Sequence, residues 1–114
     1  MLFRSTLGAK WDGKASGSFG HIACFSLQAF KHINAGEGGI LTTNDDDVAA
    51  RAILYSGSYM LYMQNGTHPP EPVFERHKYT TPNFSMRMQE LTAALARPQI
   101  SLLESRGRTV AGAL

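Results

Sequence analysis

The chain has 114 residues, of which 43% are hydrophobic and 18% are charged, and its formal net charge is +2. This length allows one compact unit at most, with a modest core, and the composition is that of an ordinary globular protein. The basic residues are scattered and no long apolar run occurs, which argues against a nucleic-acid-binding protein and against a membrane span.

The chain has a single cysteine, Cys24, so an internal disulfide is impossible and a reduced, cytoplasmic setting is expected. Cys24 lies within an apolar run, and no cationic residue is placed to activate its thiol. We therefore interpret it as a buried, inert thiol and not as a nucleophile.

In chain order, residues 11–14 (WDGK) predict a tight turn. The apolar residues of 21–27 predict a buried strand, and those of 40–43 predict a second short strand. Between them lie a small hydroxyl residue, Ser26, then Lys31, and then a glycine-rich turn at residues 36–39 (GEGG). This order predicts a strand, a loop that carries a lysine, a turn and a strand.

Lys31 allows two interpretations. Lysines are mostly solvated surface residues, and composition alone favours that role. Alternatively, a lysine that is held partly out of water loses its proton more easily and becomes a nucleophile toward a carbonyl group. Residue spacing does not decide between the two.

Residues 44–47 (NDDD) predict the start of a helix, because a polar cap precedes acidic residues in the first turn. Residues 48, 49, 52 and 53 would then share its apolar face, and Gly57 would end it. A metal site made of these consecutive aspartates is a poor alternative, since neighbouring side chains on a helix do not converge.

Residues 58–81 show no steady periodicity and contain three prolines, which predicts a functional loop or a poorly ordered segment. His68 and His77 fall in this segment without zinc-like spacing, so we interpret both as plain loop residues. From Met86 onward, apolar residues recur at helical spacing, and they include Leu91, Ala94, Leu95, Leu102 and Leu103. Pro98 predicts two helical pieces or one kinked helix there.

Four blocks of sequence occur in an order typical of one protein family. They are residues 9–20 (with AKWDGK and GSFG), residues 25–39 (with Phe25-Ser26, Lys31 and GEGG), residues 82–88 (PNFSMRM) and residues 91–99 (LTAALARPQ). On these blocks the chain resembles the DegT/DnrJ/EryC1/StrS family of sugar aminotransferases, which use pyridoxal 5′-phosphate. The resemblance implies an α/β fold, namely part of a fold-type-I PLP-dependent transferase large domain with short strands and helices.

The resemblance also implies roles for four residues. Lys31 would bond to the cofactor's aldehyde and later carry the proton as general base and then general acid. Ser26 and Asn83 would bind the cofactor phosphate, with Asn83 reaching it from the neighbouring subunit of a homodimer. Gln28 would lie near the active site, and Glu37 with its glycines would have a structural role. The expected reaction is transamination of a keto-sugar, with glutamate as the amino donor and no metal.

One branch of the family has histidine in place of the lysine and performs dehydration. Position 31 is a lysine here, which favours transamination, although His32 follows it. The aspartate that pairs with the cofactor's pyridine nitrogen would fall at about Leu2, and the glycine-rich phosphate turn has no counterpart. We therefore expect residues 1–114 to form one partial domain, truncated at both ends. The alternative is a non-catalytic remnant that acts as a binding or assembly partner.

Overall fold

The computed structural model describes residues 2–4, 7–57 and 68–103. It forms two compact units, one made of residues 1–42 and 88–114 and the other of residues 43–87. None of the described helices is long and apolar enough to cross a membrane.

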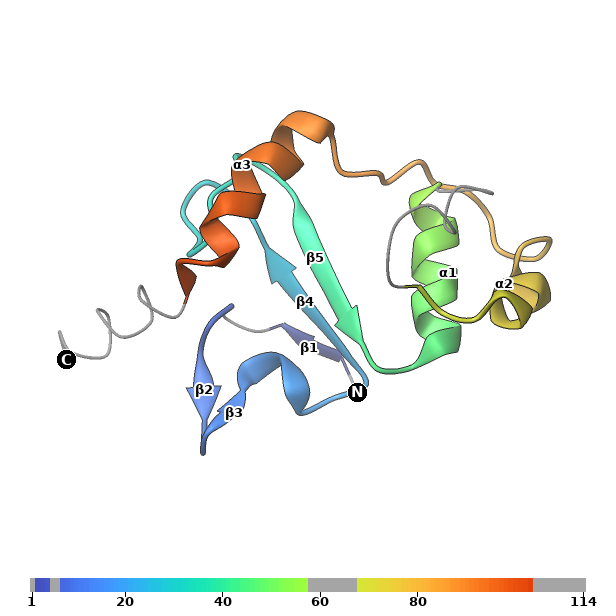
Figure 1. The fold of residues 1–114 in the computed structure, drawn as a ribbon, viewed down its shortest axis with the longest axis horizontal. Helices are drawn as coiled ribbons and strands as arrows, with labels where there is room; N and C mark the ends of the chain where they lie inside the picture. The colour runs from blue at the N-terminus through green and yellow to red at the C-terminus, as the bar shows by residue number, and fades with distance from the viewer. Residues whose placement is uncertain (1, 5–6, 58–67, 104–114) are drawn as a thin grey trace, which may run out of the picture. The chain divides into compact units, whose positions relative to one another are not determined.

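The first unit contains a small mixed sheet in the order β1-β4-β5 (Figure 1). Its strands are β1 (Leu2–Arg4), β4 (Ile22–Ser26) and β5 (Gly39–Thr43). β1 pairs in parallel with β4, and the arrows of β4 and β5 run in opposite directions in Figure 1. Both predicted strands are confirmed, with ends that differ by no more than one residue from the expectation.

A separate antiparallel hairpin is formed by β2 (Lys10–Trp11) and β3 (Lys14–Ala15). Its turn residues Asp12 and Gly13 have φ angles of 48° and 74°, as a two-residue hairpin of type I′ requires. The predicted turn is therefore confirmed.

A 3₁₀ turn, η1 (Ser16–Ser18), leads from this hairpin toward β4. A Cβ atom on Gly17 would lie 2.6 Å from Cζ of Phe25, a side chain that is buried in β4. A side chain at position 17 would therefore force the Phe25 ring to shift.

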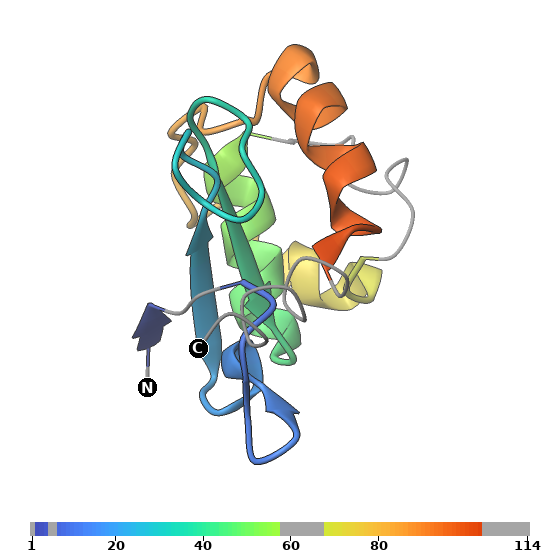
Figure 2. The ribbon, with the colours of Figure 1, turned by 90° about the vertical axis from the view of Figure 1, so that its left-hand side faces the viewer.

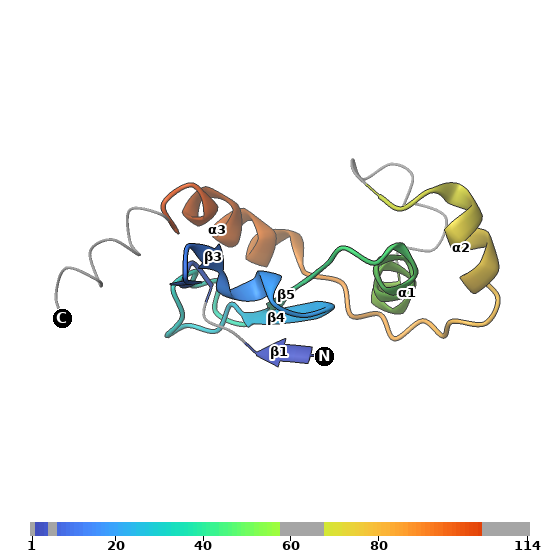
Figure 3. The ribbon, with the colours of Figure 1, turned by 90° about the horizontal axis from the view of Figure 1, so that it is seen from below.

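The core of the first unit lies at the end of the sheet where β4 stops. It contains the buried residues Leu27, Ile33, Ala35 and Ala96, with Leu7, Ile40 and Leu103 packed partly against them. Ala96 comes from α3 (Glu90–Ile100), which lies beside the loop between β4 and β5 (Figures 1 and 3).

The helix predicted from the spacing of apolar residues is confirmed as α3, which passes through Pro98 and ends two residues later. The predicted apolar face is wrong, because Leu91 and Leu95 are 71% and 50% exposed while Ala96 is buried. Within α3 the buried contact with the core therefore comes from Ala96, and of the predicted leucines only Leu103, beyond the end of α3, is among those that pack partly against the core.

The second unit contains α1 (Asp46–Ser56), whose ends follow the prediction. The side chain of Asp45 accepts hydrogen bonds from the backbone N–H groups of Asp47 and Val48 at 2.9 and 3.1 Å. Gly57 ends the helix with φ of 91°, a conformation that favours glycine.

α1 packs on a short helix, α2 (Glu71–His77), through the buried residues Ala50, Leu54, Val73 and Phe74. The predicted apolar face of α1 is confirmed only in part: Ile53 packs against this cluster, but residues 48, 49 and 52 are half-buried and the buried residues are Ala50 and Leu54. α2 contradicts the expected irregular segment at residues 71–77, because a proline in the first helical turn is compatible with a helix. Residues 58–67 of that prediction lie outside the described residues.

Candidate active site

β4 leads directly into the loop that carries Lys31. Its buried residues, Ala23 and Phe25, alternate with less buried ones, and the strand ends at the exposed residue Ser26. The N–H group of Leu27 then donates to the carbonyl of Gly38 at 2.9 Å, and that of Ala29 donates to Gly36 at 3.0 Å. These bonds connect the outgoing arm of the chain, which leaves β4, with the returning arm, which leads into β5. They close residues 27–38 into a loop beyond the strands, the lysine loop (Figure 2).

The glycine-rich turn supplies the returning arm of this loop. Gly36 and Gly38 have φ angles of 80° and 141°, which L-residues with side chains rarely adopt. The structural interpretation of these glycines is confirmed. Glu37 between them is exposed.

Lys31 lies at the outer end of the loop. Its backbone N–H donates to the carbonyl of Gln28 at 2.9 Å, and its side chain is exposed. Two residues further on, Ile33 is 1% exposed and forms part of the core. The loop is thus anchored through Ile33 and presents Lys31 to solvent, so the described residues of this chain alone do not desolvate the amine.

A side-chain oxygen accepts a hydrogen bond from a nearby backbone N–H in three of the predicted site residues, Ser26, Gln28 and Asn83. The Oγ of Ser26 accepts from Gln28 at 3.3 Å, and the Oε1 of Gln28 accepts from Phe30 at 3.2 Å. The Oδ1 of Asn83 accepts from Ser85 at 2.7 Å. Each bond uses an oxygen and leaves the hydroxyl hydrogen or the amide NH₂ group for another acceptor.

Hydroxyl and amide donors together with a lysine amine are the groups that suit a phosphate ester bearing an aldehyde. Ser26, at the end of β4, together with Gln28 and Lys31 of the loop therefore fits a cofactor such as pyridoxal phosphate in its chemistry. Asn83 belongs to the second unit and is described only within it.

The segment around Asn83 is fixed to the C-terminal end of α1. The rings of Phe84 and Tyr55 stack with centroids 5.4 Å apart, and the N–H of Phe84 donates to the carbonyl of Tyr55 at 3.0 Å. The guanidinium group of Arg87 donates to the carbonyl of Gly57 at 2.9 Å. Its positive charge there also interacts favourably with the negative end of the helix dipole. Residues 84 and 87 of the PNFSMRM block thus hold Asn83 at an exposed position.

Two residues that the sequence did not single out for a role also hold the lysine loop. The Nδ1 atom of His32 lies 2.9 Å from the carbonyl oxygen of Leu7. Gln99, which lies on α3, bonds to both backbone groups of Asn34. No local pattern could have revealed these contacts, because they join positions 25 and 65 residues apart.

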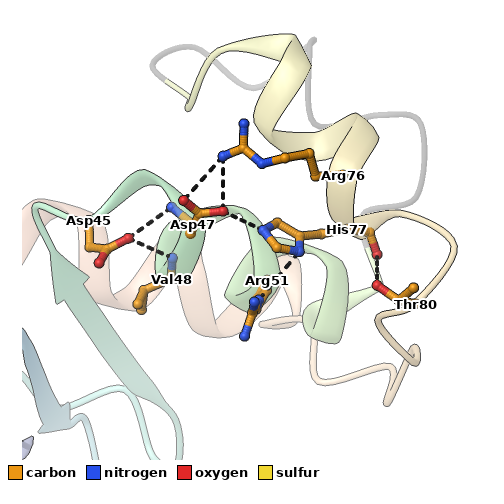
Figure 4. Close-up of polar contacts among 7 residues, drawn as sticks. All are labelled: Asp45, Asp47, Val48, Arg51, Arg76, His77 and Thr80. Carbon is orange, nitrogen blue, oxygen red and sulfur yellow. Dashed lines mark hydrogen bonds and ion pairs between the residues drawn. The ribbon is translucent and has the colours of Figure 1, made fainter.

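A polar cluster in the second unit involves Asp47, Arg76 and His77 (Figure 4). Asp47 accepts hydrogen bonds from both side chains, and these bonds hold the pKa of its carboxyl group below the usual 3.8. Arg51 donates to the Nδ1 of His77 at 3.4 Å. The prediction that His77 is a plain loop residue is wrong, since it is buried and links α2 to α1.

Two of the consecutive aspartates make different contacts. Asp45 caps α1 and Asp47 pairs with α2, so their carboxylates do not converge. Among the described residues, no group of three or more metal-ligating side chains is placed to hold a metal ion.

A model of the DegT/DnrJ/EryC1/StrS aminotransferase family matches residues 5–109. The chain belongs to this family. It is 37% identical over 98 residues to a GDP-perosamine synthase of Caulobacter vibrioides, which covers 86% of this chain and 24% of that protein. It is 29% identical over 107 residues to a GDP-perosamine synthase of Escherichia coli O157:H7, which covers 91% of this chain and 26% of that protein.

The fold is similar to the crystal structure of a mutant GDP-4-keto-6-deoxymannose-3-dehydratase with bound GDP-perosamine. The TM-score is 0.63 at 25% sequence identity, over 90% of this chain and 28% of that one. The predicted family and the predicted α/β fold class are therefore confirmed. The chain spans about a quarter of the length of these relatives.

Proposed function

We propose that the chain is the lysine-bearing part of a pyridoxal-phosphate-dependent sugar aminotransferase that transfers an amino group to a keto-sugar. The observation that carries this proposal is the closed loop after β4, which presents Lys31 to solvent and follows Ser26 directly, in a chain that belongs to an aminotransferase family. In this proposal residues 1–114 form one partial domain of such an enzyme.

Each residue would have a distinct role in the proposed reaction. The cofactor, when bound, would supply the aldehyde and the electron sink. The amine of Lys31 would bind the aldehyde covalently and, once an amino donor such as glutamate displaces it, would accept and return the substrate's proton. The hydroxyl of Ser26 and the amide of Asn83 would donate to the phosphate, and Gln28 would border the site.

Transamination is preferred over dehydration because a lysine occupies position 31. His32 is the nearby histidine, and its ring is part-buried with Nδ1 at 2.9 Å from the carbonyl oxygen of Leu7. A ring held in this way serves the loop's structure, which leaves the exposed amine of Lys31 as the group for chemistry.

The assembly that we propose is a cytoplasmic homodimer with shared sites, in which Asn83 serves the site of the neighbouring subunit. The exposed position of Asn83, whose side-chain oxygen accepts a hydrogen bond from the N–H of Ser85, supports this role. The alternative is a non-catalytic chain that pairs with a full-length relative through the same segment. A chain that stays monomeric when mixed with such a relative would exclude that alternative.

Borohydride trapping tests the proposed function directly. The chain is incubated with pyridoxal phosphate, its absorption spectrum is recorded, the product is reduced, and the labelled peptides are mapped. Lys10 and Lys14 serve as internal controls, because both are exposed on the β2–β3 hairpin. Lys78 is a weaker competitor, since its hydrogen bond to Glu75 raises the pKa of its amine.

Labelling that favours Lys31 over Lys10 and Lys14 is the expected result. Equal labelling of all the lysines, or none, would refute the proposed site in this chain. A Lys31→Arg variant keeps the charge but cannot be trapped, so it must lose the selective label while the two control lysines keep theirs.

A further inference from the structure

The amide side chain of Gln99 forms a double hydrogen bond with the backbone of the lysine loop. Its Oε1 accepts from the N–H of Asn34 at 3.0 Å, and its Nε2 donates to the carbonyl of Asn34 at 2.6 Å. Nε2 also donates to the carbonyl of Leu95 at 2.7 Å, within α3. The side chain therefore binds Asn34 as a neighbouring β-strand would, while its own orientation is fixed by the helix.

Asn34 lies three residues beyond Lys31, between the buried residues Ile33 and Ala35. Its own side chain accepts a hydrogen bond from the N–H of Gly36 at 3.1 Å, at the start of the glycine-rich turn. A constraint on the backbone of Asn34 is thus a constraint on the returning arm of the loop.

The buried contacts of Ile33 and Ala35 with Ala96 hold the loop against α3, but apolar contacts have no direction. Hydrogen bonds do have direction, and a pair of them on one residue fixes both its position and its rotation. On the other arm, the N–H of Lys31 is fixed by the carbonyl of Gln28 at 2.9 Å. Lys31 is accordingly held from both sides: the adjacent His32 contacts the carbonyl oxygen of Leu7, and Gln99 fixes the backbone on the side of the glycine-rich turn.

We propose that Gln99 is a positioning residue for Lys31, acting through its double hydrogen bond to Asn34. The inference rests on the proposed function insofar as it concerns the reactivity of the lysine. It requires an acceptor and a donor at the same side chain, so glutamate, which lacks the NH₂ group, and leucine, which has neither, both fail to replace glutamine.

Two variants and one matched control test this inference on the whole chain. Gln99→Leu removes both hydrogen bonds to Asn34 and the one to Leu95, and Gln99→Glu keeps the size while it places a carboxylate oxygen against the carbonyl of Asn34. Gln89→Leu is the control, because Gln89 precedes the same helix, is exposed and makes no capping hydrogen bond.

The first measurement needs no cofactor and reports the motion of the loop. Amide order parameters from NMR relaxation should be about 0.85 at Lys31 and Asn34 in the original chain and should fall toward about 0.6 in both Gln99 variants. Gln89→Leu should leave them unchanged. Unchanged order parameters in folded Gln99→Leu and Gln99→Glu would overturn the proposal.

The second measurement reports the consequence for the amine. Selective borohydride labelling of Lys31 relative to Lys10 should fall about tenfold in the Gln99 variants, since a displacement of ~1 Å can cost up to ~10²-fold in reactivity. Full selectivity in spite of a loosened loop would make Gln99 a structural contact only and would overturn its positioning role. Absence of selective labelling in the original chain would instead refute the proposed function, and the order parameters would still decide whether Gln99 fixes the loop.

Discussion

Ile33 is the residue that anchors the lysine loop in the core, and we predict that Ile33→Ala strongly destabilises the first unit. The side chain is 1% exposed and lies among Leu27, Ala35 and Ala96. Truncation would remove three carbon atoms from this cluster and leave a cavity between the loop and α3.

The expected magnitude follows from these contacts. Removing three buried carbons costs about 2.4 kcal/mol in transfer free energy, at about 0.8 kcal/mol each. The cavity adds to this, so the free energy of unfolding should fall by about 2–5 kcal/mol. Ile33→Val removes one carbon and should cost about 0.5–1.5 kcal/mol. Urea unfolding followed by circular dichroism measures both values.

Phe30 provides a matched control in the same loop, since it is apolar but 90% exposed. Phe30→Ala should change the free energy of unfolding by no more than about 0.5 kcal/mol. If Ile33→Ala and Phe30→Ala had equal effects, or if Phe30→Ala were the more damaging variant, the loop would not be anchored as described.

Three further predictions concern turns, caps and charge. Asp45→Ala removes the cap of α1 and should lower stability by about 1 kcal/mol in urea unfolding, and an unchanged midpoint would contradict the capping role. Gly36→Ala places a side chain at φ of 80° and should cost about 1–2 kcal/mol in the same assay, so a neutral result would argue against the turn geometry. The bonds from His77 and Arg76 lower the pKa of Asp47, so their contribution is present above the usual 3.8 and is lost as the pH falls below it. Asp47→Asn should therefore flatten the acid limb of a pH–stability curve, and an unaltered acid limb would count against the ion pair.

The parts of the fold with local signals could be predicted from the sequence. β4, β5 and α1 follow from short apolar runs, from the cap at Asp45 and from the stop at Gly57. α2 has no clear local signal, because prolines normally interrupt helices, although a proline in the first turn fits a helix. The buried face of α1 differs in part from the predicted one, because periodicity does not tell which neighbour a helix meets, and here that neighbour is α2.

In the candidate site, too, local features can be predicted from the sequence and tertiary contacts cannot. The resemblance to known sequences identifies four candidate residues, whose roles are proposed above: Lys31, Ser26, Gln28 and Asn83. The backbone hydrogen bonds that orient Ser26 and Gln28 span two residues each and are local. Gln99 was visible only as part of a block, because its contact with the loop depends on a tertiary arrangement that no short window of sequence contains.

The contact between Asn34 and Gln99 also bears on the order of folding. Its partners are separated by 65 residues, whereas the bonds that close residues 27–38 span at most 11. Contacts of long sequence separation form slowly, since the intervening chain must first be brought together. During synthesis the lysine loop can close early, but it acquires its final constraint only after α3 has emerged. A ribosome-bound chain that stops short of residue 99 would therefore carry Lys31 in a closed but still mobile loop.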